Sequence, residues 1–403
     1  MWLLLKPEEP LLVGDVRGDS QFLAGRTYVP GRVLRGALAI DLMREGKTSP
    51  EILETMAGIR VWNFFPAPRW HQIEYALPLP LTAVTCKTNP GFVKAPSQVK
   101  RGHGVVDWLI PFLAYRLLEL AGARFPVPFS IECAQDDCRA RMEWKESFYS
   151  VHRHGDEISY VAVEPVFHAQ TRVALSRHRR ASFEEMLYTA SALAPEVKSP
   201  DGEGSCPIVF LGRVQGETRV IERLEEALSR TPIGAMHNRG YGRVSLERCD
   251  VRLPPLAERL KLFNQTLQDL WKDLKRIAVD APDQETPEGI YFTIDLLSPA
   301  VFSVEGVPSL RPLLIIGDTV LEPLLWVTRP DIASGWSTAW GLPKPTDLAA
   351  RMGSVYVFRW EGPRDELVSA LAAIEQQGIG ERTDESFGEC IVCHPFHLEV
   401  KET

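Results

Sequence analysis

The sequence lacks a long hydrophobic run. No stretch of the 403 residues approaches the roughly eighteen consecutive apolar residues that a membrane-spanning helix needs. The apolar run of residues 2–5 is too short for a signal peptide, and its charged residue, Lys6, follows the run instead of preceding it. We therefore expect a cytoplasmic protein without a membrane partner.

Cysteine is scarce. The chain has 7 cysteines, an odd number at irregular spacing. This usage argues against a disulfide framework and leaves metal binding open. A hydrophobic content of 45% and a charged content of 24% are those of an ordinary globular protein, and the length predicts about two or three domains.

A net positive charge is also missing. The chain has 45 Lys and Arg against 53 Asp and Glu, a formal net charge of -8. It is therefore not expected to coat nucleic acid generally, and any such contact must be local. The basic residues form three clusters, which are Arg26, Arg32 and Arg35; Arg172, Arg177, His178, Arg179 and Arg180; and His237, Arg239 and Arg243.

The most informative stretch is glycine-rich and spans residues 233–244 (IGAMHNRGYGRV). Its glycines let the backbone approach a bulky ligand, while Arg239 and Arg243 offer guanidiniums to phosphate. Residues 219–230 have the apolar spacing of a helix, so the order is helix, glycine-rich loop, strand. A dinucleotide-binding fingerprint needs strand, loop, helix, and this order argues against one.

A second glycine-rich loop lies near the C-terminus. The helical pattern of residues 365–377 is followed by Gly378, Gly380 and Gly388, and then by a strand-like Cys390–Val392. Because one supersecondary ending occurs twice, the sequence predicts two homologous lobes.

The turn before the first expected helix admits two interpretations. Pro30-Gly31 leads into a helix that continues to Arg44. The free amides of that helix N-terminus, with Arg32 and Arg35 beside it, could bind a phosphate. Alternatively, the turn only packs the helix on the sheet, and the residues alone do not separate the two.

The region from about residue 60 to 164 predicts an insertion into the first lobe, since it is rich in proline around one convincing helix at residues 105–120. It contains four potential zinc ligands, Cys86, His103, Cys133 and Cys138. Three thiolates and one imidazole would complete a tetrahedral Zn²⁺ site and stabilise a region with little core. The alternative is four unrelated residues, two of them buried as small hydrophobic side chains.

A basic segment follows an expected strand at residues 160–167. Arg172 and the run of residues 177–180 (RHRR) stand among short polar residues, and a helix is expected over residues 182–193. The basic residues predict a phosphate-binding track. A solvated charge run is the alternative.

Together these patterns predict an α+β fold of two ferredoxin-like (RRM-like) lobes, each running strand, helix, strands, helix, glycine-rich loop, strand. We place the N-terminal lobe at residues 1–253, with its insertion, which holds the four candidate zinc ligands, at about 60–164. An amphipathic linking helix is expected within residues 254–280, and the C-terminal lobe at 281–403.

Several stretches resemble the RAMP superfamily of CRISPR-Cas proteins. They are VPGRVLRGALA at residues 29–39, HAQTRVALSRHRRA at 168–181 and the two glycine-rich loops. More closely, the chain resembles the large two-lobed RAMP subunit of type III-D effector complexes, whose members carry similar TCKTNPGF, GVVDWL, GWSTAWGLPK and GSVYVF stretches. The resemblance covers almost the whole chain.

The resemblance implies a structural, RNA-binding subunit. Such a subunit caps the backbone filament, holds the repeat-derived 5′ handle of the crRNA, and contacts the large polymerase-like subunit and a neighbouring RAMP backbone subunit. By matching positions, it implies handle contacts at Gly31, Arg32, Arg35, Arg177, Arg179, Arg180, Arg239, Gly240, Tyr241 and Gly242. The basic patterns described above add Arg172 and Arg243 as candidate RNA contacts. Ser386 stands where a glycine is expected, so the second loop could be a structural remnant.

An endoribonuclease is the alternative function. Other RAMP proteins process repeat RNA with a histidine as general acid or base, and His168 and His237 lie beside basic clusters. Asp15 or Asp19 could instead serve target-RNA cleavage, as loop aspartates do in backbone RAMP subunits. No His-Tyr-Lys or paired-histidine constellation is evident, so we expect binding without catalysis.

Overall fold

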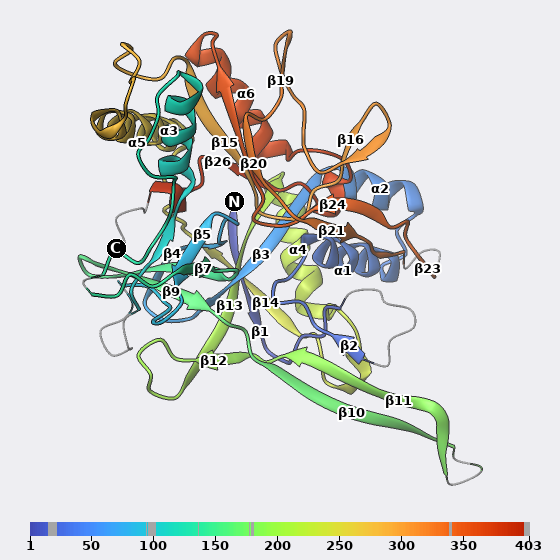
Figure 1. The fold of residues 1–403 in the computed structure, drawn as a ribbon. Helices are drawn as coiled ribbons and strands as arrows, with labels where there is room; N and C mark the ends of the chain where they lie inside the picture. The colour runs from blue at the N-terminus through green and yellow to red at the C-terminus, as the bar shows by residue number, and fades with distance from the viewer. Residues whose placement is uncertain are drawn as a thin grey trace.

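The computed structural model describes residues 1–14, 22–93, 95, 102–135, 137–176, 178, 181–337 and 341–398. Small, mostly antiparallel sheets and a few helices form the body, and a long two-stranded arm extends away from it (Figure 1). No helix in these ranges is long and apolar enough to cross a membrane.

The first sheet has the strand order β3-β13-β1-β14, and each neighbouring pair is antiparallel. Its strands are β1 (Trp2–Pro7), β3 (Ile59–Pro68), β13 (Ser205–Gly216) and β14 (Val244–Cys249), and the short β12 (Glu196–Lys198) also pairs with β13. Helices α1 (Gly31–Arg44) and α4 (Thr218–Arg230) complete a ferredoxin-like arrangement. The predicted α+β fold class is confirmed.

The helices of this lobe follow from their sequences. In α4, Ile221, Leu224 and Leu228 recur at helical spacing and are buried in one core with Leu34 and Leu38 of α1. Helix α2 (Ser49–Ala57) begins with a capping box between Thr48 and Glu51, but it buries no side chain and lies on the surface.

The second sheet has the same antiparallel order, β20-β25-β15-β26. Its strands are β15 (Ile290–Leu296), β20 (Leu325–Val327), β25 (Val355–Trp360) and β26 (Cys390–Val392). Helix α6 (Arg364–Gln377) lies between β25 and β26, as predicted. The sheet therefore repeats the strand order of the first lobe.

The helix predicted between the first two strands of this lobe is absent, and that prediction is wrong. Residues 297–324 instead form two hairpins, β16 (Phe302–Val304) with β17 (Val307–Ser309) and β18 (Leu314–Ile316) with β19 (Thr319–Leu321). Positive φ angles at Gly306 and Gly317 form their tight turns. Two further pairs follow, β21 (Pro330–Ala333) with β24 (Asp347–Ala350) and β22 (Trp336–Ser337) with β23 (Leu342–Pro343).

The insertion forms two small sheets, β4-β8-β9 and β6-β5-β7, and one helix. Its elements are β4 (Gln72–Pro78), β5 (Ala83–Cys86), β6 (Val105–Asp107), α3 (Leu109–Leu120), β7 (Met142–Trp144), β8 (Phe148–His154) and β9 (Glu157–Val163). Strand β3 falls inside the range predicted as insertion but belongs to the first sheet. The inserted elements therefore begin with β4.

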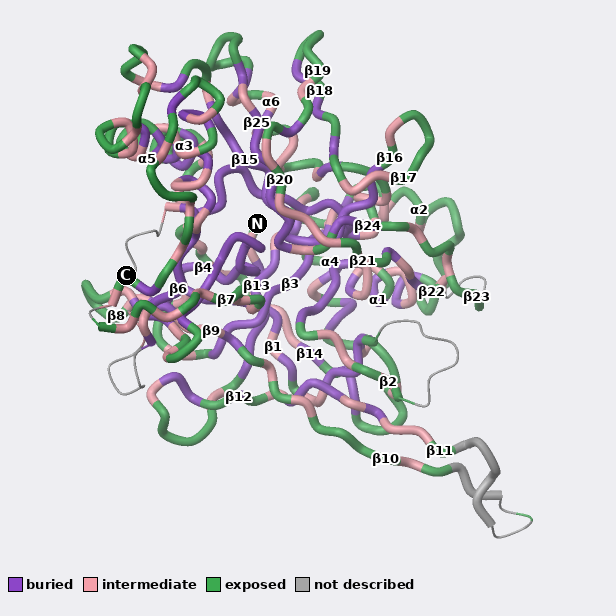
Figure 2. The backbone as a smooth tube through the Cα atoms, viewed as in Figure 1, coloured by how far each residue is buried: buried purple, intermediate pink, exposed green. Residues whose placement is uncertain are grey.

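Helix α3 and the linking helix α5 (Leu256–Ile277) pack into the core of the second lobe. Leu113 of α3 and Phe263 of α5 belong to one buried cluster with Phe292 and Phe358 of the sheet. Figure 2 shows the strands at this junction as buried. The insertion and the linking helix thus supply apolar cover to a sheet that lacks a first helix of its own.

A buried imidazole fixes the C-terminal 3-10 helix η3 (Pro395–Leu398) to both the insertion and the second sheet. His397 Nδ1 lies 3.1 Å from Asp107 of β6, and its Nε2 lies 2.7 Å from Asp295 of β15. Burial alone would lower the pKa of His397, but Asp295 and Asp107 outweigh it and raise that pKa to about 10. His397 is therefore a buried cation between two carboxyl groups.

The arm is a hairpin of β10 (Phe167–Ser176) and β11 (Ala181–Leu193), and β11 also pairs in parallel with β2 (Phe22–Ala24). The prediction of a helix over residues 182–193 is wrong, because these residues belong to strand β11. The glutamates, methionine and alanines of that segment favour a helix locally, but two long-range strand pairings override the preference.

Candidate RNA-binding surface and candidate metal centre

The first glycine-rich loop, residues 233–243, joins α4 to β14 and contains the short 3-10 helix η1 (His237–Arg239). Gly242 has φ +95°, and a Cβ there would lie 2.3 Å from the Ile233 carbonyl oxygen, so only glycine fits. The Gly242 carbonyl accepts a 2.8 Å bond from the Ile233 N–H. Gly240, by contrast, has open space beside it, and Arg239 is exposed.

The loop packs against the root of the arm. Tyr241 is only 4% exposed and joins a core cluster with Ala190 and Ala192 of β11. Its hydroxyl donates a 2.7 Å hydrogen bond to Gln170 of β10. Because its ring is buried, Tyr241 holds the loop in place and offers no stacking surface to a base.

Two arginines, one from the arm and one from the loop, lie where the loop packs against the arm. Arg172 of β10 donates to Gln170 at 2.7 Å and to the Tyr241 hydroxyl at 3.4 Å, and Arg239 donates to the Tyr188 hydroxyl at 2.7 Å. Strand register places Arg172 opposite Tyr188. All these partners are neutral, and neither guanidinium contacts a carboxylate in the described part of the chain. Their charge is therefore available to a phosphate. We call Arg172, Tyr188, Arg239 and Gly240 the arm-root surface.

Arg243 differs from these arginines, because an acid accompanies it. Its Nε lies 3.7 Å from Glu9, and its backbone carbonyl accepts hydrogen bonds from Glu8 and Glu9. The side chain is exposed, so its predicted RNA contact stays a prediction, but part of its charge is already balanced.

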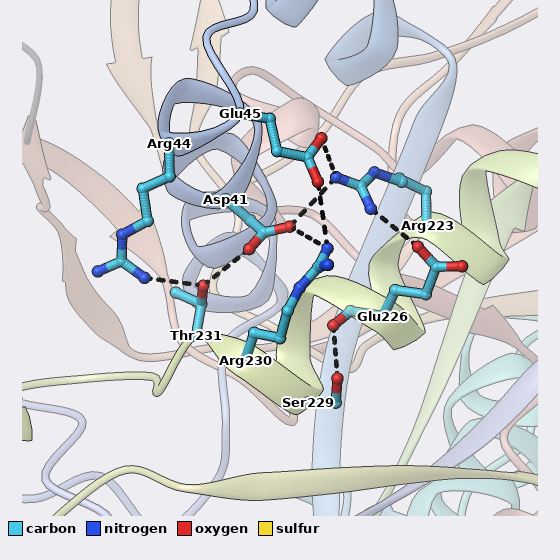
Figure 3. Close-up of polar contacts among 8 residues, drawn as sticks. All are labelled: Asp41, Arg44, Glu45, Arg223, Glu226, Ser229, Arg230 and Thr231. Carbon is cyan, nitrogen blue, oxygen red and sulfur yellow. Dashed lines mark hydrogen bonds and ion pairs between the residues drawn. The ribbon is translucent and has the colours of Figure 1, made fainter.

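An ion-pair network holds the end of α4 on α1, just before the loop begins (Figure 3). The buried carboxylate of Asp41 accepts from Arg223 at 3.3 Å and from Arg230 at 2.9 Å. Thr231, the residue after α4, donates to the same carboxylate at 3.3 Å, and Arg44 donates to the Thr231 hydroxyl. The network thereby fixes the point from which the glycine-rich loop departs.

The predicted site at the N-terminus of α1 lies elsewhere, at the junction with the second lobe. The Gly31 N–H donates to Asn63 at 3.2 Å, and a Cβ at Gly31 would lie 2.1 Å from the Val61 carbonyl oxygen. Burial lowers the pKa of Arg32 to about 10, and its guanidinium lies 4.9 Å from the Phe387 ring. Of the two interpretations of this turn, the structure favours packing.

Arg35 also faces the second lobe. It donates to the Met56 carbonyl at 3.1 Å and lies 3.9 Å from Asp384. The RNA contacts predicted for Gly31, Arg32 and Arg35 stay predictions, but the three residues lie apart from the arm-root surface. The predicted contacts at Arg177, Arg179 and Arg180, and the candidate Asp15 and Asp19, lie outside the described residues.

The histidines of the alternative function are both exposed. His168 lies on β10 and His237 in η1. Within the described residues, neither imidazole hydrogen-bonds to a carboxylate that could orient it for proton transfer. Among the described residues, therefore, no acid-base pair is seen at His168 or His237.

The four predicted zinc ligands come together. The ligand atoms of Cys86, His103, Cys133 and Cys138 all lie within 4.8 Å of one another. The Cys86 and Cys138 sulfurs are 3.7 Å apart, and the Cys133 sulfur lies 3.4 Å from His103 Nδ1. Ligands at tetrahedral Zn²⁺ distances would be separated by about 3.8 Å for two sulfurs and about 3.6 Å for sulfur and nitrogen. The residues present therefore fit a closed Cys3His metal site.

Backbone donors shape this cluster. Burial raises the pKa of the Cys86 thiol, but hydrogen bonds from the Asn89 and Thr88 N–H groups outweigh burial and bring it down to about 7. Cys86 ends β5, and the loop to β6 returns the chain to His103. The cluster therefore closes the base of that loop.

The chain is thus an α+β protein with two ferredoxin-like sheets and a local cationic surface beside a glycine-rich loop. Residues 258–394 match the family described as CRISPR-associated protein (Cas_Cmr3). The match runs from within α5 to just past β26, and over these residues it agrees with the resemblance to RAMP proteins of type III CRISPR-Cas systems. No curated protein sequence matches the chain.

Solved structures with low overall similarity accompany the family match. A chain of the type III-B Cmr-beta complex bound to cognate target RNA is 12% identical, with 89% of this chain and 86% of that chain covered and a TM-score of 0.41. The same complex bound to target RNA and AMPPnP gives 13% identity, coverage of 94% and 89%, and a TM-score of 0.41. A chain of the Csm3-Csm4 subcomplex from a type III-A interference complex is 11% identical, with 89% of this chain and 93% of that chain covered and a TM-score of 0.33.

Proposed function

We propose that this chain is an RNA-binding structural subunit of a type III CRISPR-Cas effector complex, without catalytic activity of its own. It holds the repeat-derived 5′ handle of the crRNA at the arm-root surface. It caps the backbone filament, next to the large polymerase-like subunit and a neighbouring RAMP subunit, in the cytoplasm.

One observation carries the RNA-binding proposal. Among the described residues, Arg172 and Arg239 have only neutral partners, so each presents an unbalanced positive charge in a chain whose net charge is -8. Phosphate contacts of this kind position a strand but do not read its bases, so a preference for the intact handle needs base contacts in addition. Gly240, with open space beside it, lets the phosphate backbone approach the loop closely.

The test is binding of the chain, purified with its complex partners, to crRNA carrying an intact or a scrambled 5′ handle. We expect tighter binding of the intact handle and RNA of unchanged length. Arg172→Ala should weaken binding, whereas Arg276→Ala, which removes an exposed arginine of α5 that pairs with Asp273, should not. Equal affinity for both handles would contradict handle binding, and shortened RNA that disappears in His168→Ala or His237→Ala would establish the endoribonuclease alternative.

We further propose that Zn²⁺ occupies the Cys3His cluster as a structural ion. Four protein ligands close the coordination sphere and leave no position for a substrate, and the metal would hold the loop between β5 and β6. Cys133→Ser should abolish stoichiometric zinc, measured by plasma emission spectroscopy, and lower the melting temperature by several degrees. Cys249→Ser, at a free cysteine on β14, is the matched control and should retain the metal. Protein purified without stoichiometric zinc would contradict this proposal.

A further inference from the structure

The hairpin β18–β19 has large aliphatic side chains on both faces. Along β18, Leu314 and Ile316 are buried in the core of the second lobe, whereas Leu313 and Ile315 alternate with them on the outside. Ile315 is 71% exposed, and its cross-strand partner Val320 is 60% exposed. A half-buried antiparallel hairpin normally carries polar residues on its outer face. The outer face of this hairpin is therefore unusual for a surface that remains in water.

The neighbouring edge strand extends the apolar surface. Strand β20 ends the second sheet and pairs only with β25 in the described structure. Leu324 and Trp326 are exposed along it, and Arg311 lies 4.6 Å from the Trp326 ring, so the segment before β18 folds back onto β20. We call Leu313, Ile315, Val320, Leu324 and Trp326 the hairpin patch.

Acidic side chains accompany the hairpin patch. Asp318 and Glu322 are exposed at the two ends of β19, and Glu366 of α6 lies beside the Gly317 turn. None of the three forms an ion pair within the described ranges. Arg311 stacks on Trp326. The patch would therefore repel RNA phosphates and attract a basic protein surface.

The position of the patch supports the same partner. Figure 1 shows the β18–β19 hairpin and the arm projecting from opposite ends of the molecule. A strand of RNA at the arm root would leave the hairpin patch uncovered. Exposed clusters of large apolar side chains on a soluble domain mark protein-protein contact sites.

We propose that the hairpin patch docks another protein subunit, one that presents apolar side chains ringed by lysine or arginine. This inference rests on the proposed function, since it assumes that the chain works inside an assembly. Ile315 and Val320 are the central contacts, Trp326 lies at the β20 edge, and Asp318 and Glu322 pair with the basic ring of the partner.

The test co-expresses the full chain with the remaining protein subunits of its effector complex and a crRNA, and measures by size exclusion and mass spectrometry how much chain is incorporated. Ile315→Asp and, separately, Val320→Asp should each lower incorporation about tenfold or more. The control is Ile332→Asp, because Ile332 is 59% exposed on another two-stranded sheet of the same lobe. Ile332→Asp should be incorporated as well as the wild type. When purified alone, all three variants should have the melting temperature of the wild-type chain.

Charge reversal tests the acidic ring. The double change Asp318→Lys and Glu322→Lys should also reduce incorporation, with the loss growing at low salt. Unchanged incorporation of the Ile315 and Val320 variants would overturn the inference. The inference would also be overturned if the free chain formed a homodimer, or bound crRNA, and Ile315→Asp abolished that dimer or that binding. Either result would identify a different occupant of the hairpin patch. Failure of the proposed function is distinct from these outcomes, since it would appear as equal affinity for intact and scrambled handles.

Discussion

The two glycine-rich loops have the same backbone but different surroundings. Ile379 N–H donates to the Gly388 carbonyl at 2.8 Å, just as Ile233 N–H donates to the Gly242 carbonyl in the first loop. Each loop has two left-handed residues around a 3-10 turn, Met236 and Gly240 around η1 and Arg382 and Ser386 around η2 (Thr383–Glu385). The aromatic residues Tyr241 and Phe387 are buried at matching positions. The loops are thus two copies of one structure.

The surroundings separate the two copies. The first loop presents Arg239 and Gly240 to solvent beside the arm. The second faces the first lobe, where Ser386 donates to the Val61 carbonyl at 2.8 Å and the Ser386 carbonyl accepts from the Asn63 amide at 3.1 Å. Glu389 accepts from the Asn63 N–H at 3.0 Å. One loop conformation therefore provides a candidate ligand surface in one lobe and an interface between lobes in the other.

Glycine substitutions test the backbone geometry of the two loops, and their effect on stability should be large. At Gly388, φ is +69° and a Cβ would lie 1.9 Å from the Ile379 carbonyl oxygen, so Gly388→Ala should cost more than about 3 kcal/mol of unfolding free energy. Gly242, which matches Gly388, has a similar clash, whereas Gly240 matches Ser386, so Gly240→Ala should cost only about 1 kcal/mol because φ is +78° but the surrounding space is open. Urea denaturation measures both, and equal costs would contradict the described loop geometry.

The pH dependence of stability tests the lobe interface beside the second loop, where Glu389 is buried. Burial raises the pKa of Glu389 to about 7, so the folded state binds its proton more tightly than the unfolded state does. The contribution of Glu389 to the free energy of unfolding should therefore fall as pH rises from the ordinary glutamate value through about 7, by as much as about 3 kcal/mol. His152 and His394, whose pKa values burial lowers, contribute the opposite slope in this range, so the measurement is the difference between the wild type and Glu389→Gln at each pH. A variant with the same pH dependence as the wild type would show that another group titrates.

A smaller effect is expected at the arm root. Tyr188→Phe removes the hydroxyl that accepts from Arg239 and leaves the strand intact. We expect crRNA affinity to fall only a few-fold, about 1 kcal/mol, because the guanidinium keeps its charge but loses its orientation. Fluorescence anisotropy with labelled crRNA measures the change. A loss as large as that of Arg239→Ala would mean that Tyr188 itself contacts the RNA.

Local patterns carried most of what the sequence could predict. The helical spacing of α4 and α6 and the glycines that follow them predicted both loops, and the spacing of Cys133 and Cys138 indicated the metal cluster. These features depend on residues close in the chain or on a distinctive ligand chemistry.

Long-range pairing determined what the sequence could not predict. Residues 182–193 form a strand because β10 and β2 pair with them, although their composition favours a helix. Gln170, which links Tyr241 and Arg172, was missed for the same reason, since only strand alternation over residues 168, 170 and 172 would have placed it on the loop-facing side. The second lobe dispenses with a first helix because α3 and α5 arrive from elsewhere in the chain.

The most direct test of the account compares the arginines of the two loops. The salt dependence of crRNA binding should be measured for the wild type, Arg239→Ala and Arg382→Ala, with thermal melting to verify folding. Arg239→Ala should weaken binding and reduce the slope of log K against log salt by about 0.7, the value for one phosphate contact on a single strand. Arg382, which pairs with Asp347 and Glu385, should leave the slope unchanged. An unchanged slope for Arg239→Ala, or an equal reduction for both variants, would contradict the assignment of RNA binding to the first loop.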